Sequence, residues 1–286
     1  MAGRILRSPN TLLWVAALVV GLLFPFSSAI ADEDDEYEFS RPFITEYPEA
    51  DSELRLSFFI VNGDREPGRI TRFPRTLQEN GLLGRTHLVR LLAEYAFRHN
   101  ASIEVEIPWA NFDPVSGSSV SHFGDIELGL KFVTSEDEDR GTATAFGLEV
   151  KAPTGSNALG IGSDTKWELE PFVVFGKKHG RWETIGVVRL GFILNEPAGE
   201  ASETELGFDV SVLRHLSERW EALVEVNGEH GLRGEEAGAT LVTITPGLKW
   251  RPSAHRREQI GVGASFPVTG PREFASRVFV MLFKPL

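Results

Sequence analysis

The 286-residue chain contains no cysteine, and this absence excludes disulfide frameworks, thiolate metal sites and cysteine nucleophiles together. Basic residues are also few, because 29 Lys and Arg stand against 41 Asp and Glu, giving a formal net charge of −12. Nucleic-acid binding needs a basic face, so this balance argues against a nucleic-acid partner. A mean hydropathy of −0.11 excludes a membrane protein built from several helical spans, but it does not exclude a β-barrel.

The first thirty-one residues have the pattern of a secretory signal peptide. A short start with two arginines precedes an uncharged run over 11–26, and the small-residue pattern Ala-Ile-Ala ends at Ala31. The uncharged run is short for a spanning helix of about 20 residues, so a membrane anchor is the less favoured alternative. Cleavage after Ala31 would leave an acidic periplasmic segment over 32–52 ahead of the remaining chain, 53–286.

From Leu54 onward, apolar and polar residues alternate with a period of two, which is typical of β-strands. Between Phe123 and Phe132, for example, Ile, Leu, Leu and Phe share one face, and Asp, Glu, Gly and Lys share the other. Most of these runs have nearly the ~9–11 residues that a tilted strand needs to cross a bilayer. Twelve runs occur, at 54–61, 86–97, 101–109, 123–133, 142–153, 165–176, 182–194, 203–214, 219–229, 238–250, 257–267 and 276–284.

The gaps between these runs favour one orientation, because long gaps such as 62–85 and 110–122 alternate with short ones such as 98–100 and 215–218. Outer-membrane barrels have long outer loops and short periplasmic turns. The sequence therefore predicts an all-β, antiparallel up-and-down transmembrane β-barrel of about 12 strands over 53–286, with its first strand running outward. A protein of this kind belongs in the cell outer membrane, contacts membrane lipid and is inserted by the barrel assembly machinery.

Tryptophans support the same orientation, because all five beyond the signal peptide fall at strand ends on the apolar face. We expect them to form aromatic girdles at the two membrane interfaces. The outer girdle would hold Trp109 and Trp167, and the periplasmic girdle would hold Trp182, Trp220 and Trp250. Prolines argue against continuous barrel strands, since a proline inside a strand has no N–H to donate to the hydrogen-bond ladder. The runs contain Pro108, Pro171 and Pro246, and Pro171 is the hardest to accommodate.

The polar face of the strands would line the lumen. Its charges cannot form the dry core of a soluble sandwich, because burying each one unpaired costs several kcal/mol. Eight strands leave a filled interior and about sixteen leave an aqueous channel, so twelve predict a narrow path. The side chains expected to line that path are Arg90, Lys131, Arg189, Glu127, Glu168, Glu170 and Glu225. Their long side chains could meet across the lumen and form a constriction.

No residue pattern of catalysis or metal binding accompanies the strands. The seven histidines lack the spacing of a metal site, and neither a Gly-x-Ser-x-Gly elbow nor a phosphate-binding loop occurs. No catalytic residue, cofactor or metal is therefore predicted. The alternatives to a channel are a barrel enzyme, a structural barrel sealed by ion pairs or by residues 32–52, and a soluble periplasmic β-sandwich that binds a ligand.

Two segments carry a resemblance to a known family: Leu148-Glu-Val-Lys-Ala-Pro-Thr-Gly-Ser156, followed by Leu159-Gly-Ile-Gly162, and Gly124-Asp-Ile-Glu-Leu-Gly-Leu-Lys131. Together they resemble the outer-membrane family labelled putative MetA-pathway of phenol degradation, over roughly 120–285. The resemblance implies an outer-membrane β-barrel that passes small organic solutes, aromatic ones among them. In the residues themselves, Pro-Thr-Gly ends one strand, and the following glycines permit positive φ in an outer loop.

Overall fold

The computed structural model describes residues 39–63, 85–113, 118–156, 162–163, 165–195, 202–234, 237–253, 257–269 and 274–286. The signal peptide predicted over 1–31 lies outside these residues, as does the acidic stretch 32–38. Among the described residues, no helix has both the length and the apolar character that a membrane span requires.

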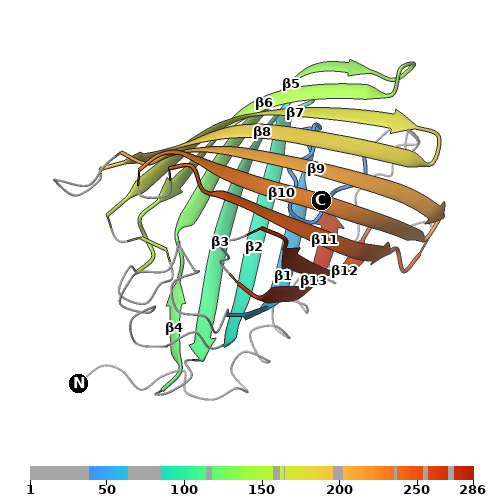
Figure 1. The fold of residues 1–286 in the computed structure, drawn as a ribbon. Coiled ribbons are helices and arrows are strands. Elements are labelled where there is room, and N and C mark those ends of the chain that lie inside the picture. The colour runs from blue at the N-terminus through green and yellow to red at the C-terminus, as the bar shows by residue number, and fades with distance from the viewer. Residues whose placement is uncertain are drawn as a thin grey trace. The chain divides into compact units, whose positions relative to one another are not determined.

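One antiparallel sheet closes on itself to form a barrel (Figure 1). Apart from β4 and β5, which both pair with β3, strands that follow one another in sequence pair with one another, and β13 pairs with β1 over ten residues, which completes the ring. The strands are β1 (Glu53–Asn62), β2 (Arg85–Arg98), β3 (Ala101–Asp113), β4 (Val120–Phe123), β5 (Ile126–Asp137), β6 (Thr142–Ala152), β7 (Trp167–His179), β8 (Trp182–Leu194), β9 (Thr204–Ser217), β10 (Trp220–Arg233), β11 (Thr240–Trp250), β12 (Gln259–Pro267) and β13 (Ser276–Pro285). The predicted all-β up-and-down barrel is confirmed.

The predicted strand at 123–133 corresponds to β5, and a short additional strand, β4, precedes it, mostly within the predicted loop 110–122. β4 pairs with β3 at 109–112, and β5 pairs with the opposite end of β3, at 101–106. Between them the N–H of Gly124 donates to the carbonyl oxygen of Pro108, at 2.9 Å. β4 and β5 therefore occupy one place in the wall beside β3, and the wall has the twelve places that the sequence predicts.

Each of the three prolines lies at an interruption of the ladder. Pro108 sits where the partner of β3 changes from β5 to β4. Pro171 pairs with Leu148 on β6, but the ladder from β7 to β8 skips the position of this proline. Pro246 pairs with Val224 on β10, and the ladder from β11 to β12 skips it in the same way. Since proline has no N–H to donate, the barrel accommodates each one by omitting ladder bonds on one side only.

Alternation along the strands separates an apolar outer face from a polar inner face. On β7, Val173 and Phe175 are 53% and 51% exposed on the outside, whereas Phe172 and Val174, which alternate with them, are buried. Four of the five tryptophans are exposed on the outer face and Trp109 is half-buried. The rings of Trp220 and Trp250 are neighbours across β10 and β11, with their centroids 6.2 Å apart. Their place in a membrane-interface girdle stays a prediction.

Candidate functional site

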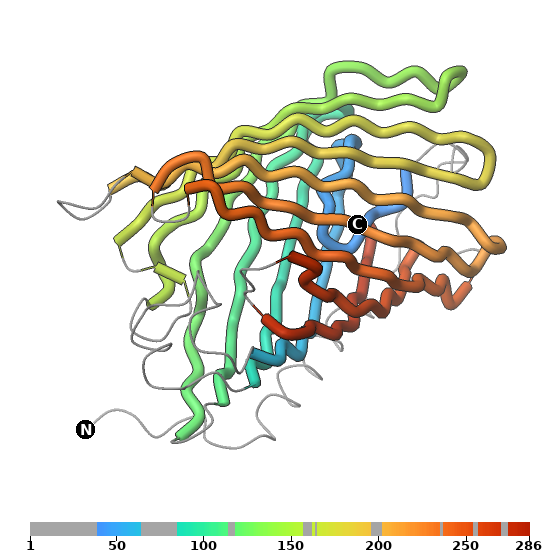
Figure 2. The backbone as a smooth tube through the Cα atoms, viewed as in Figure 1, coloured from blue at the N-terminus to red at the C-terminus, as the bar shows by residue number. Residues whose placement is uncertain are grey.

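Residues 39–52 lie inside the barrel before the chain enters β1. Phe39, Phe43 and Tyr47 are each 3% exposed or less, and they pack in one cluster with inward-facing residues such as Val174 and Phe279. In Figure 2 this blue start of the described chain forms a loop within the ring of strands. Part of the acidic segment expected ahead of the barrel is thus a filling of its lumen, and we call residues 39–52 the luminal segment.

Glycines in the wall make room for the aromatic side chains of the luminal segment. A Cβ atom added to Gly247 or Gly261 would lie 2.2 Å from the ring of Phe43. A Cβ on Gly176 would lie 2.8 Å from both Phe39 and Pro48. Glycine weakens a strand but lets another group approach the backbone closely. At these positions the missing side chain leaves the space that the rings of the luminal segment occupy.

Glu225 on β10 holds the backbone of the luminal segment. Its carboxylate accepts hydrogen bonds from the N–H groups of Phe43 and Ile44, at 3.2 Å, and of Thr45, at 3.1 Å. Consecutive backbone N–H groups form a concave site for an anion, so the carboxylate takes the place of a bound ion. Glu183 accepts from the N–H of Ser40 at 2.7 Å. The sequence places Glu225 in the lumen correctly, but it does not reveal this role.

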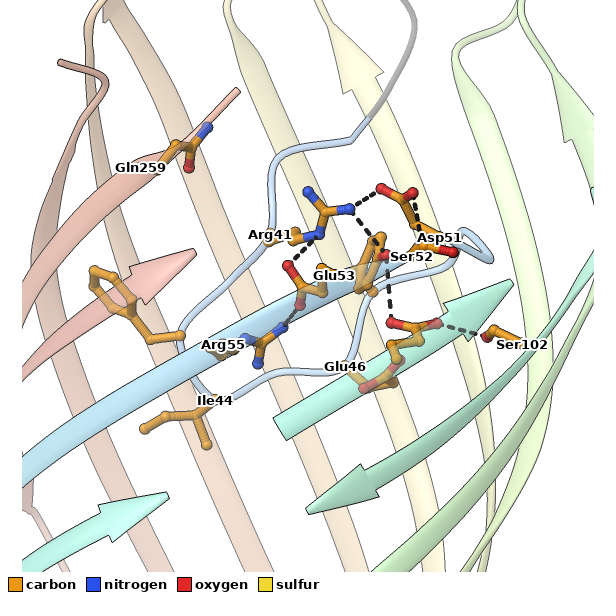
Figure 3. A network of polar contacts seen from close by, with 12 residues as sticks. Arg41, Ile44, Glu46, Asp51, Ser52, Glu53, Arg55, Ser102 and Gln259 are labelled. Carbon is orange, nitrogen blue, oxygen red and sulfur yellow. Dashed lines mark hydrogen bonds and ion pairs between the residues drawn. The ribbon is translucent and has the colours of Figure 1, made fainter. Parts of the chain in front are cut away.

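A buried ion-pair network fixes the far end of the luminal segment (Figure 3). Glu53, which is completely buried, lies 2.7 Å from Arg41 Nε on one side and 2.7 Å from an Arg55 guanidinium nitrogen on the other. Arg41 also pairs with Asp51. Because Arg41 bonds to residues after the turn of the segment, the network closes the segment into a loop. A buried pair of this kind is costly to break from one side.

Lys131 on β5 ties the opposite side of the segment to the wall. Its Nζ atom lies 2.6 Å from Glu46 of the segment and 2.9 Å from Glu94 of β2, and it sits 4.2 Å from the centroid of the Tyr47 ring. Burial raises the pKa of the Tyr47 phenol well above its usual value, so this hydroxyl stays protonated. Glu94 also accepts a hydrogen bond from the Ser102 hydroxyl, at 2.5 Å.

A second charged group faces the lumen where β6 ends and β7 begins. Lys151 is 2.7 Å from Glu168 and 3.8 Å from both Glu127 and Glu170. The structure thus brings together three residues that the sequence analysis places in the lumen. Lys151 at their centre belongs to the same polar face of the strands, as its alternation with Val150 and Ala152 predicts.

The predicted cations do not meet in one constriction. Arg90 lies 3.5 Å from Glu106, Arg189 pairs with Asp209, and Lys131 is bound within the segment network. Three separate sets of ion pairs replace the single expected constriction, because each long side chain finds a carboxylate on another strand or in the luminal segment. What narrows the lumen is the luminal segment.

The sequence indicates residues 32–52 as a possible seal of the barrel, but it singles out no side chain within them. Arg41 and Glu46 precede the first alternating run, so the two-residue period gives no reason to choose them. The available signal is that the aromatic residues Phe39, Phe43 and Tyr47 recur every four residues. Such a regular set of large apolar side chains favours a packed segment over an exposed tail. In the part of the chain that the structure describes, no three or more His, Cys, Asp or Glu side chains are arranged to hold a metal ion.

The two segments behind the family resemblance contact one another. Asp125, at the break between β4 and β5, accepts hydrogen bonds from the N–H groups of Gly155 and Ser163, both at 2.8 Å. Thr154 accepts from the N–H of Ile126 and donates to the carbonyl oxygen of Gly124. Gly162 has a φ of 80°, where a side chain would be strained and would meet Asp125. Gly160 lies outside the described residues.

Comparisons with known proteins agree with this architecture. The family model described as putative MetA-pathway of phenol degradation matches residues 73–278. No curated protein matches the sequence. Because the structural matches below are under 25% identical, they show a shared fold and no more.

Three solved structures illustrate that fold. The COG4313 outer membrane channel from Pseudomonas putida F1 has a TM-score of 0.62 and 13% identity, covering 90% of this chain and 100% of that one. The NanC porin has a TM-score of 0.51 and 8% identity, with coverage of 81% and 97%. The KdgM porin in complex with disordered oligogalacturonate has a TM-score of 0.52 and 11% identity, with coverage of 82% and 99%.

Proposed function

Because this chain belongs to the family described as putative MetA-pathway of phenol degradation, and because its closed barrel surrounds a charged lumen, we propose that it is an outer-membrane channel for small solutes. The observation that carries the proposal is the opposite polarity of the two faces of the wall. On β5 and β6, Leu128 and Leu148 are exposed outside, while Glu127, Lys131 and Glu149 face inward. Such a wall suits lipid outside and water inside.

The luminal segment limits what can pass. It occupies the lumen beside Lys131, Glu225 and Glu183, so the path along it is narrow and admits small solutes only. Small organic molecules, aromatic ones among them, are the solutes that the family description suggests. The channel and porin folds of the solved structures support the same reading. The role proposed is transport without catalysis.

Export and insertion follow from the location. We propose that residues 1–31 are removed as a signal peptide, and that the barrel assembly machinery inserts the remaining chain. Heat-modifiable mobility on a gel and fractionation with the outer membrane test this part. Recovery of the mature protein in the soluble periplasmic fraction would contradict it.

Recording in planar bilayers, together with liposome swelling, tests the channel itself. The full chain should give discrete single-channel currents and should admit small neutral solutes, including phenol-sized aromatics, into liposomes. A Glu225→Gln variant, which weakens the hold on the luminal segment, should give larger currents. Folded protein that gives neither current nor swelling, with or without the substitution, would instead indicate a sealed structural barrel.

A further inference from the structure

Carboxylates gather on one side of the lumen. Four neighbouring strands of the ring, β3, β5, β6 and β7, direct Glu side chains inward between outward apolar residues such as Ile103 and Val173. We call this set the acidic wall. It consists of Glu104, Glu106, Glu127, Glu149, Glu168 and Glu170.

The opposite side of the ring carries no acid. With β4 and β5 sharing one of the twelve places, β11 and β12 lie directly across the ring from β5 and β6. β11, β12 and the adjoining β13 contain no Asp or Glu at any position. Their charged inward residues are Lys249 and Arg277, alongside Gly, Ser and Thr. The lumen is therefore polarised across its width.

Basic side chains of the barrel neutralise only part of the acidic wall. Arg90 and Lys151 pair with members of the wall, which leaves a formal surplus of four negative charges. Lys131 adds no net relief, because it is shared between Glu46 and Glu94.

Two members of the wall lack a direct ion-pair partner. Among the described residues, Glu104 and Glu149 have no hydrogen-bond or ion-pair partner. Both line a small cavity beside Phe172, with space for about one water molecule. They lie near the depth at which Glu46 of the luminal segment narrows the path. A solute passing this depth meets two carboxyl groups that no ion pair engages.

We propose that the acidic wall makes the channel selective for cations over anions, with small organic ammonium ions among its solutes. The inference rests on the proposed channel function and adds a charge class to it. Fixed charges at a narrow, low-dielectric wall focus their field into the lumen. The screening length is ~8 Å at physiological salt, so the field of the wall extends into the lumen. Cations accumulate along the wall and anions are excluded.

The reversal potential of the full chain tests the proposal. In a tenfold KCl gradient at pH 8, the permeability to K⁺ should exceed that to Cl⁻ by about threefold or more. The double variant Glu104→Gln/Glu149→Gln removes the two unpartnered charges with little change of shape, and the ratio should fall by about half. The double variant Glu138→Gln/Asp139→Asn removes two charges from the exposed turn before β6, and it should leave the ratio unchanged.

The outcomes distinguish a failure of the proposed cation selectivity from a failure of the proposed channel function. Currents without cation preference, or a preference that survives Glu104→Gln/Glu149→Gln, would overturn the selectivity and leave the channel intact. If the double variant fails to fold, as judged by heat-modifiable mobility, the two single variants decide, and each should lower the ratio. Absence of any current from the full chain and from Glu225→Gln would overturn the channel, and the selectivity with it.

Discussion

Glu225 is completely buried, and its carboxylate is bound by three consecutive backbone N–H groups of the luminal segment. Hydrogen bonds to a charged group contribute more than those between neutral groups. The residue therefore controls how firmly the segment stays in place. Its neighbours along β10 alternate as in any barrel strand, so nothing in the local pattern distinguishes it.

Replacing Glu225 by Gln should loosen the luminal segment by about 1–3 kcal/mol, because the amide oxygen keeps one acceptor but loses the charge. Single-channel recording should then show larger or more frequent openings than the full-length wild type. Glu218→Gln, in the exposed turn between β9 and β10, serves as the control. Equal currents from the wild type and Glu225→Gln would mean that this carboxylate does not retain the segment.

Gly261 offers a second test, aimed at the aromatic contact. The three atoms nearest to a Cβ at this position all belong to the ring of Phe43, so Gly261→Ala should displace that ring and leave the strand backbone in place. Gly186→Ala is the matched control, since its Cβ would have ordinary space, 3.9 Å from the nearest atom.

We expect a larger conductance from Gly261→Ala and no change from Gly186→Ala. In the double variant Gly261→Ala/Phe43→Ala, the glycine substitution should add nothing to Phe43→Ala alone, because the clash is gone. Additive effects of the two substitutions would show that Gly261 acts through something other than Phe43.

At the scale of the strands, the two faces are the feature that sequence predicts best. Alternation fixes which residues point outward, and a shift of one residue would turn every side chain to the wrong face. The short strand β4, mostly inside the expected loop 110–122, was not predictable in this way. The break that follows it holds Asp125, whose partners Gly155 and Ser163 lie 30 and 38 residues further along the chain.

Val173 and Glu170 on β7 test the assignment of the faces. Val173 is 53% exposed in the middle of its strand, so Val173→Arg should lower the free energy of unfolding by about 2–4 kcal/mol in a bilayer. Glu170→Arg should cost much less, because this side chain points into the lumen beside Lys151. Reversible urea unfolding in liposomes measures both. Similar losses for the two variants would refute the assignment.

Asp125 can be tested at the same scale. Asp125→Ala removes both carboxylate bonds that join the break after β4 to residues 155 and 163. The free energy of unfolding should fall by about 1–3 kcal/mol, while the closed barrel and its heat-modifiable mobility persist. Asp139→Ala, in the exposed turn between β5 and β6, should change it little. An unchanged stability for Asp125→Ala would mean that the two family segments meet without supporting each other.

At the scale of the whole molecule, the barrel follows from local pattern and the filling of its lumen does not. Twelve alternating runs suffice to predict a closed wall, because each strand pairs with its neighbour in sequence. The contact between Lys131 and Glu46 joins residues 85 positions apart, and only the closed ring brings them together. The same holds for Glu225 and the backbone of residues 43–45. A narrow lumen was therefore predictable, and residues 32–52 could be named as a possible filling, but the side chains that hold the segment there could not.

The central claim is that this barrel is a channel whose width is set by the luminal segment. Single-channel conductance of the full chain, compared in one bilayer with that of a chain lacking residues 39–52, tests this claim most directly. We predict discrete currents from both proteins and a clearly larger unit conductance after the deletion, with heat-modifiable mobility showing that both are folded. Equal conductances, or no current from either folded protein, would contradict the account.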